Sequence, residues 1–190
     1  MSRIRTFMHR VAVGAVAAGV LAVGAMAAPA GAQAAPEEAR QTYAAQTLRA
    51  GLTADQAGEL QGRVDRYLAR LEGGEQVSAN RIALPGGDLT VAAPGQPSAR
   101  DLASPAASGR LPAACARGYL CLTRGGDRMD LYRCGTYSMP WTGDGTFENN
   151  QSSGTRARFL NSDRSVRYIT DPAYSQGTVT WTPIYYVVPC

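Results

Sequence analysis

Lysine is absent from this sequence, and histidine occurs once, at His9 near the N-terminus. Imidazole is the usual general base of enzymes, the partner of nucleophilic serine or cysteine, and the commonest zinc ligand. A mature chain without His9 therefore has no histidine for such chemistry, and only reactions run by carboxylates alone stay open to it. We expect the protein not to be an enzyme.

Acidic residues are also absent from the first 34 positions, which have the three parts of a secretory signal peptide. Arginines lie in the first ten residues, an uncharged run rich in Ala, Val and Gly covers 11–28, and small residues end at Ala32-Gln33-Ala34. Ala25-Met26-Ala27 offers a second cleavage site. The alternative is a membrane anchor, but an Ala/Gly-rich run with one Leu has low hydrophobicity for a stable span. We expect residues 1–34 to be removed and the mature protein to be secreted, extracellular and free of the membrane.

The mature chain is close to electrically neutral, since 16 arginines stand against 15 acidic residues once the signal peptide is removed. These arginines form no basic cluster dense enough to act as a nucleic-acid footprint. We expect no nucleic-acid partner.

All four cysteines lie in the last 76 residues, at Cys115, Cys121, Cys134 and Cys190. An even number in a small exported domain predicts two disulfides, whose pairing the spacing leaves open among three possibilities. Zinc bound by four thiolates is the rival interpretation. It is disfavoured because no C-x-x-C pair is present and the compartment is oxidising.

Helical patterns follow the signal peptide. Thr53 to Gln56 has the form of a capping box, and Gly73-Gly74 is typical of a helix end. A weaker helical pattern covers 37–50. The apolar residues of the main helix recur at three- and four-residue spacing: Leu60, Val64, Leu68 and Leu71.

A hairpin and a linker complete the N-terminal part. Residues 77–84 and 89–91 flank the turn sequence Pro85-Gly86-Gly87-Asp88. The resulting helix-plus-hairpin segment, 35–92, is too small to be stable by itself, so we expect it to lean on the next domain or to serve as a pro-segment. Residues 93–113 are rich in Pro, Ala, Ser and Gly, which predicts an extended linker or, alternatively, an ordered strap.

The C-terminal part, 114–190, has the pattern of an all-β domain. Short apolar–polar alternations are separated by Gly, Asn, Asp and Ser, and no stretch has sustained helical periodicity. The clearest predicted strands are 119–123, 129–132, 157–160, 166–169 and 181–188.

An internal repeat appears when this part is shifted against itself by 37 residues. The turns at 124–127 and 161–164 coincide, and Trp141-Thr142 falls on Trp181-Thr182 after a further shift of three. The matched apolar pairs, at alternate positions as inward-facing residues require, are Leu120 with Ala157, Leu122 with Phe159, Met129 with Val166, and Leu131 with Tyr168. Two units of about four strands each predict a sandwich of paired Greek keys.

The cysteine frame gives the chain a family resemblance. The motifs are Cys115 to Leu122, Cys134-Gly135-Thr136-Tyr137, Asn149-Asn150-Gln151, Trp181-Thr182-Pro183 and the final Cys190. In these the chain resembles peptidase inhibitor family I36, the actinobacterial secreted proteins typified by the Streptomyces metalloproteinase inhibitor. The resemblance implies a βγ-crystallin-like domain of two Greek keys, with Cys115 bridged to Cys121 and Cys134 to Cys190.

Two loops are candidates for an inhibitory segment. One is the disulfide-anchored stretch with Gly135, Thr136 and Tyr137, and the other is the Gly/Asn-rich connection 143–154. A rigid exposed loop is what blocking an enzyme cleft requires. An ordinary connecting loop is the alternative for each.

A calcium site is a further hypothesis. Many βγ-crystallins bind calcium through an N/D-N/D-x-x-S/T-S element, and Glu148, Asn149, Ser152 and Ser153 approach it with Glu in the first place. The corresponding stretch of the second repeat, 183–188, offers no such oxygens. We expect no other cofactor.

The sequence hypothesis is therefore a monomeric secreted proteinase inhibitor, with a metalloproteinase as the partner implied by the resemblance. The main alternative is a non-inhibitory βγ-crystallin-like module that binds calcium or a cell surface or acts as a toxin. A carboxylate-dependent hydrolase is a third class, disfavoured because the aspartates sit mostly in turn sequences, where Asp is favoured for backbone reasons.

Overall fold

The computed structural model describes residues 37–104 and 114–190. The signal peptide expected at 1–34 lies outside these residues, as does the stretch 105–113 of the expected linker. Within the described ranges, no helix has the length and apolar character needed to cross a membrane.

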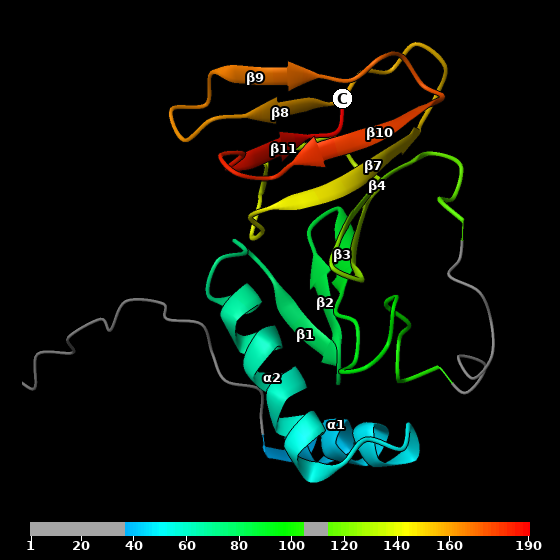
Figure 1. The fold of residues 1–190 in the computed structure, drawn as a ribbon, viewed down its shortest axis with the longest axis vertical. Helices are drawn as coiled ribbons and strands as arrows, with labels where there is room; N and C mark the ends of the chain where they lie inside the picture. Colours follow the sequence, from blue (N-terminus) through cyan, green and yellow to red (C-terminus); the bar gives the residue numbers. More distant parts are fainter. Residues whose placement is uncertain (1–36, 105–113) are drawn as a thin grey trace, which may run out of the picture. The chain divides into compact units, whose positions relative to one another are not determined.

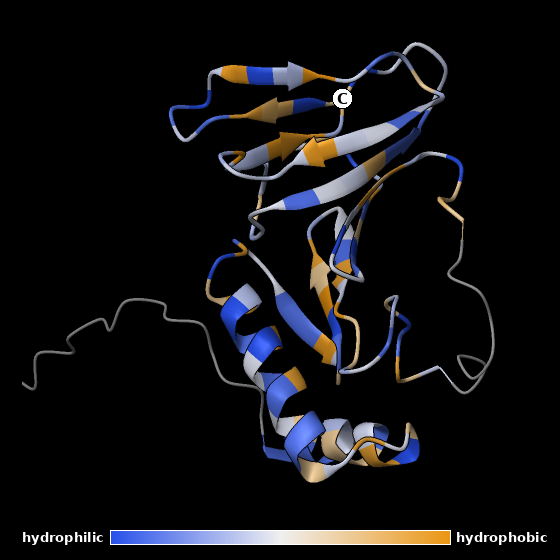
Figure 2. Cartoon of the chain, in the orientation of Figure 1, coloured by the Kyte–Doolittle hydropathy of each residue, from blue (hydrophilic) through white to orange (hydrophobic). Residues whose placement is uncertain are grey.

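Two helices open the described chain, α1 (Glu37–Arg49) and α2 (Ala54–Leu68). The capping box is confirmed: the Thr53 N–H donates to the Gln56 side chain at 2.9 Å, and the Thr53 hydroxyl accepts from the Gln56 N–H at 3.2 Å. The end expected at Gly73-Gly74 is wrong. The helix stops at Leu68 because the next turn carries Leu71 into the core. Figure 2 shows hydrophilic residues along much of α2.

Three short strands follow, β1 (Glu75–Ser78), β2 (Arg81–Leu84) and β3 (Gly87–Thr90). The expected strand 77–84 is broken by a turn at Ala79-Asn80. The Asn80 side chain is fully buried, donates to the Val91 and Arg100 carbonyls at 2.7 Å each, and accepts from the Leu102 N–H. These tertiary hydrogen bonds stabilise a turn that the local sequence does not predict.

The strands form two antiparallel sheets, one of seven strands ordered β1-β2-β3-β5-β4-β7-β10 and one of four ordered β6-β11-β8-β9 (Figure 1). The C-terminal strands are β4 (Tyr119–Arg124), β5 (Asp127–Leu131), β6 (Tyr137–Ser138), β7 (Asp144–Asn150), β8 (Arg158–Leu160), β9 (Val166–Ile169), β10 (Ser175–Thr180) and β11 (Tyr186–Val188). The predicted β-rich C-terminal part with two disulfides, preceded by helix and hairpin, is confirmed.

The C-terminal strands fall into two units of four, β4–β7 and β8–β11, with the same arrangement. Three strands of each unit lie together in the order second, first, fourth, and the third strand lies in the other unit's sheet. Trp141 and Trp181 each lie between the third and fourth strands of their unit, with ring centroids 5.8 Å apart. The two units therefore share one core.

The matched positions of the repeat differ in burial. Met129 and Leu131 on β5 are fully buried, whereas Val166 and Tyr168 on β9 are 49% and 42% exposed. The difference has a simple cause. In the seven-stranded sheet β5 pairs with β3 on one side and with β4 on the other, whereas β9 is an edge strand of the four-stranded sheet.

The strand expected over 181–188 is wrong in its first half. Ile184 donates to the Trp181 carbonyl in a turn, and the strand covers only Tyr186–Val188. The structure also contains β6, β7 and β10, which the apolar pattern did not reveal. Their composition explains the omission, because β7 and β10 are made mostly of Gly, Thr, Asn and Gln.

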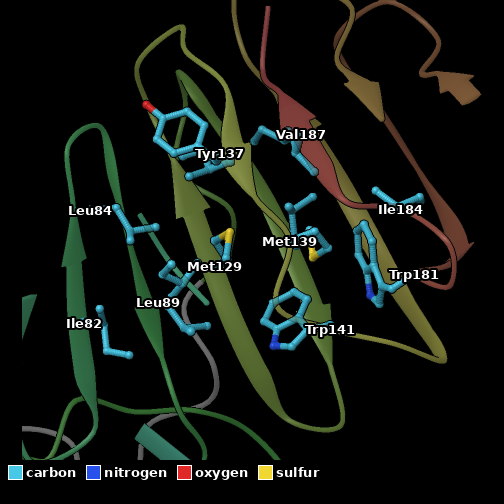
Figure 3. Packing of buried hydrophobic residues seen from close by; sticks show 14 of the residues in the cluster. Ile82, Leu84, Leu89, Met129, Tyr137, Met139, Trp141, Trp181, Ile184 and Val187 are labelled. Carbon is cyan, nitrogen blue, oxygen red and sulfur yellow. The ribbon is translucent and has the colours of Figure 1, made fainter. Parts of the chain in front are cut away.

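The N-terminal segment packs on the C-terminal domain through β3, which pairs with β5 from Gly87 opposite Leu131 to Thr90 opposite Arg128. Apolar residues of both parts belong to one core cluster, and Figure 3 shows Ile82, Leu84 and Leu89 together with Met129. The segment therefore leans on the domain.

Residues 93–104 form an ordered strap, which is the alternative that the sequence left open beside an extended linker. The Ala99 N–H donates to the Gly126 carbonyl at 2.8 Å, and the Asp101 carboxylate accepts from the Ser78 hydroxyl at 2.8 Å. These bonds tie the strap to the β4–β5 turn and to the end of β1.

Candidate functional site

The connection between β5 and β6 is an exposed loop, residues 132–136, which we call the β5–β6 loop. Its five residues are all exposed, between the buried Leu131 and the buried Tyr137. Gly135 and Thr136 are thus accessible, as expected. Tyr137 is not a loop residue: it begins β6, pairs with Val187 and is only 9% exposed.

Both disulfides join the pairs that the family resemblance implied, Cys115 with Cys121 and Cys134 with Cys190. The second bridge spans 56 residues and connects the β5–β6 loop to the chain beyond β11. The loop is therefore covalently fixed to the second unit.

The turn between β2 and β3 contacts the same loop and holds it by hydrogen bonds. The Gly86 carbonyl accepts the N–H groups of Tyr132 and Arg133 at 2.9 and 3.2 Å. A Cβ at Gly86 would collide with the Tyr137 hydroxyl and lie 2.6 Å from the Arg133 Cβ. Only glycine fits this close approach.

Tyr137 closes the support by donating its hydroxyl to the Arg133 carbonyl at 3.0 Å. Burial raises the pKa of the Tyr137 phenol, with a smaller contribution from Tyr132. The phenol therefore stays protonated and keeps its hydrogen bond throughout the neutral range.

A groove of about 550 Å³ runs beside the loop. One wall is the chain from Arg133 to Ser138, and the other comes from the N-terminal segment. The residues of that second wall are Leu71, Glu72, Gly73, Leu84 and Pro85.

The second candidate loop, 143–154, is wrong for most of its length. Residues 144–150 form β7, which pairs with β4 on one side and β10 on the other. Phe147 and Asn149 alternate into the interior of the sandwich. A central strand leaves only 151–154 as a connection, so this stretch is not a long inhibitory loop.

The four residues of the calcium hypothesis are not brought together. Glu148 and Asn149 are neighbours on a strand, so their side chains point to opposite faces. The buried Asn149 amide donates to the Thr155 carbonyl at 2.9 Å, whereas Glu148 accepts from the exposed Tyr174 hydroxyl at 3.0 Å. Ser152 and Ser153 lie in the turn beyond. No cluster of three His, Cys, Asp or Glu suited to a metal occurs within 37–104 and 114–190.

A buried carboxylate joins α2 to the C-terminal domain. Asp127 is fully buried and accepts from the Arg63 guanidinium and the Tyr67 hydroxyl at 2.5 Å each, and from the Ala92 N–H at 2.9 Å. Burial, then the hydrogen bond to Asp127, raises the pKa of Tyr67 to about 12. The carboxylate is thus fully hydrogen-bonded, as a buried charge requires.

Beside this network lies a small cavity that sequence reasoning missed. Arg63 and Arg66 on α2 and Arg70, two residues beyond its end, line one side of it, and Arg124 and Trp141 line it from the domain. The three- and four-residue spacing of these arginines is a signal that could have revealed a basic stripe. Arg124 and Trp141 had no such signal, because only the fold brings them near α2.

Comparison of the chain with family models, with curated proteins and with solved structures gives no match. The family resemblance accordingly depends on the motif residues quoted above.

Proposed function

We propose that this protein is a secreted proteinase inhibitor that blocks the active-site cleft of its target with the β5–β6 loop. The observation that carries the proposal is five consecutive exposed residues whose two ends are held by Cys134–Cys190, by Gly86 and by the buried Tyr137. The target class, a metalloproteinase, comes from the resemblance to family I36.

Preorganisation is the physical basis of the proposal. Ordering one flexible residue costs about 1–2 kcal/mol of conformational free energy, so a flexible five-residue loop would lose much of its contact energy on binding. Here folding has already ordered the loop. A target that cut the chain between Cys134 and Tyr137 would leave the first end on a disulfide and the second in β6. Both ends would stay in place, which favours a long-lived complex over release.

The strand arrangement supports the family part of the proposal. Two four-stranded units that exchange their third strands are what a sandwich of two βγ-crystallin-like Greek keys would have. The N-terminal hairpin and strap are then additions to that domain, and the hairpin supports the inhibitory loop through Gly86.

The test is a titration of the chain from residue 35 onward against a thermolysin-like metalloproteinase. We expect stoichiometric loss of proteolysis. Thr136→Arg should weaken inhibition roughly tenfold or more, because it adds bulk and charge within the loop that makes the contact. Ser162→Arg, in the exposed turn between β8 and β9, is the matched control and should inhibit like the unaltered protein.

Full proteolytic activity with slow degradation of the added protein would overturn the proposal. The non-inhibitory binding module would then be the better interpretation. Thermal unfolding with and without calcium would show whether that module is a calcium-binding one, since a ligand bound by the folded state raises Tm.

A further inference from the structure

The cavity beside α2 is lined by cationic and hydrogen-bond-donating side chains. Its volume is about 210 Å³, and none of the residues lining it is acidic. Its cationic and aromatic donors are Arg63, Arg66, Tyr67, Arg70, Arg124 and Trp141.

Among the described residues, three of the four guanidinium groups have no carboxylate partner. Arg63 is paired with Asp127, but no ion pair between described residues involves Arg66, Arg70 or Arg124. The lining therefore has an uncompensated positive charge, which favours an anion.

Two of these arginines are held in place by the segment that carries Trp141. Arg70 donates to the Pro140 carbonyl at 3.0 Å, and Arg124 donates through Nε to the Thr142 carbonyl at 3.0 Å. Each contact uses one of the five N–H groups of a guanidinium, so most donors remain for a ligand. The cavity is thus formed before any ligand binds.

The indole of Trp141 gives an independent indication of a ligand. The ring is 3% exposed, and its Nε1–H is buried with no hydrogen-bond partner. The indole N–H lies close enough to the Tyr67 hydroxyl to lower the pKa of that phenol. The two groups do not meet the distance and angle of a hydrogen bond. Buried N–H groups without partners are rare in folded proteins.

The repeat supplies an internal comparison for this indole. The equivalent Trp181 is fully buried and donates Nε1–H to the Thr123 carbonyl at 3.0 Å. The same residue in the same place of the other unit is therefore satisfied by the protein. At Trp141 the donor has no such carbonyl partner, and the residue lines the arginine-rich cavity instead.

We propose that this cavity binds a small, multiply charged oxyanion, namely phosphate, free or as a simple monoester. Arginine forks match the spacing of tetrahedral oxyanion oxygens, and an indole N–H is a neutral donor for a further oxygen. The cavity is too small for a folded partner. Arg66 and Arg70 are exposed, so a bound ion can exchange with solvent. A bound ion would contact both α2 and the C-terminal domain and would hold the two together.

The test follows the two indole N–H signals in ¹H–¹⁵N NMR spectra of the mature protein as inorganic phosphate is added. We expect a saturable shift of the Trp141 signal, with little change at Trp181, and none when chloride of equal ionic strength replaces phosphate. Glycerol 3-phosphate in a parallel titration separates the sources: tighter binding than phosphate assigns the site to monoesters, and weaker binding assigns it to the free ion.

Arg66 on α2 and Arg70 just beyond its end are both exposed, so the fold should survive Arg66→Gln and Arg70→Gln. Each should weaken phosphate binding roughly tenfold. Arg167→Gln, on the exposed edge strand β9, removes the same charge elsewhere and should leave binding unchanged. Absence of a saturable shift, or equal weakening by all three variants, would show that phosphate acts only through general electrostatics and would overturn the proposal.

Discussion

Leu89 in β3 lies opposite Met129 in β5, and both side chains are fully buried. The pair joins the N-terminal hairpin to the first strands of the disulfide-linked domain. The hairpin therefore contributes to the same hydrophobic core and does not form a separate one.

Leu89→Ala should lower the free energy of unfolding by about 2–5 kcal/mol, because it leaves a cavity between two parts of the chain. Urea denaturation followed by circular dichroism would measure the change. Val77→Ala, at a half-exposed position of β1, should cost less than about 0.5 kcal/mol. Equal effects of the two substitutions would contradict the shared core.

The two disulfides should differ in their contribution to stability. Replacing Cys134 and Cys190 by Ser should cost about 4 kcal/mol, and replacing Cys115 and Cys121 about 2 kcal/mol, because the longer loop restricts the unfolded chain more. Thermal unfolding of the two double variants gives the order. On the proposed mechanism, only loss of Cys134–Cys190 also weakens inhibition, so an inhibitory Cys134→Ser/Cys190→Ser protein would argue against the β5–β6 loop.

Gly86→Ala should displace the β5–β6 loop, because the added methyl group has no space beside Tyr137 and Arg133. A loss of about 1–3 kcal/mol is expected, together with faster hydrogen exchange at the Tyr132 and Arg133 amides. Gly58→Ala is the control. Gly58 lies in α2 with no atom near its would-be Cβ, so alanine there should be stabilising by about 0.5–1 kcal/mol.

Stability should decrease at alkaline pH through Tyr67. Its pKa is raised from 10.0 to about 12 in the folded protein, so the folded state retains a proton that the unfolded state releases. The contribution of Tyr67 to the free energy of unfolding is complete below its pKa in the unfolded chain. It falls by up to about 1.4 kcal/mol per pH unit as the pH rises toward its pKa in the folded protein. Denaturation curves between these pH values would show the slope, and Tyr67→Phe should reduce it. An unchanged slope in Tyr67→Phe would assign the effect to other groups.

Local signals were sufficient for part of this fold. The capping box at Thr53 fixed the start of α2, and the turn at Gly125-Gly126 marked the β4–β5 hairpin. The strand β7 was not predicted, because a buried Asn149 occupies an inward position where the apolar–polar pattern requires an apolar residue. Its amide is satisfied by Thr155 and Thr170, and Thr170 lies 21 residues away along the chain.

The candidate sites show the same division. Gly135 and Thr136 are exposed, as the sequence predicted for a loop anchored by a disulfide at Cys134. The burial of Tyr137 depends on pairing with Val187 and on contact with Gly86, both distant in sequence. The arginine-lined cavity depends on the packing of α2 against Trp141, which no local pattern encodes.

The exchange of third strands has a consequence for how such a domain could arise. A chain carrying one four-stranded unit would have no neighbour for its fourth strand, and only the third strand of a second copy could fill that edge. Its smallest complete form would be a dimer whose population depends on concentration. Joining two copies in one gene would convert that dimer into a single chain, whose halves would then be free to diverge.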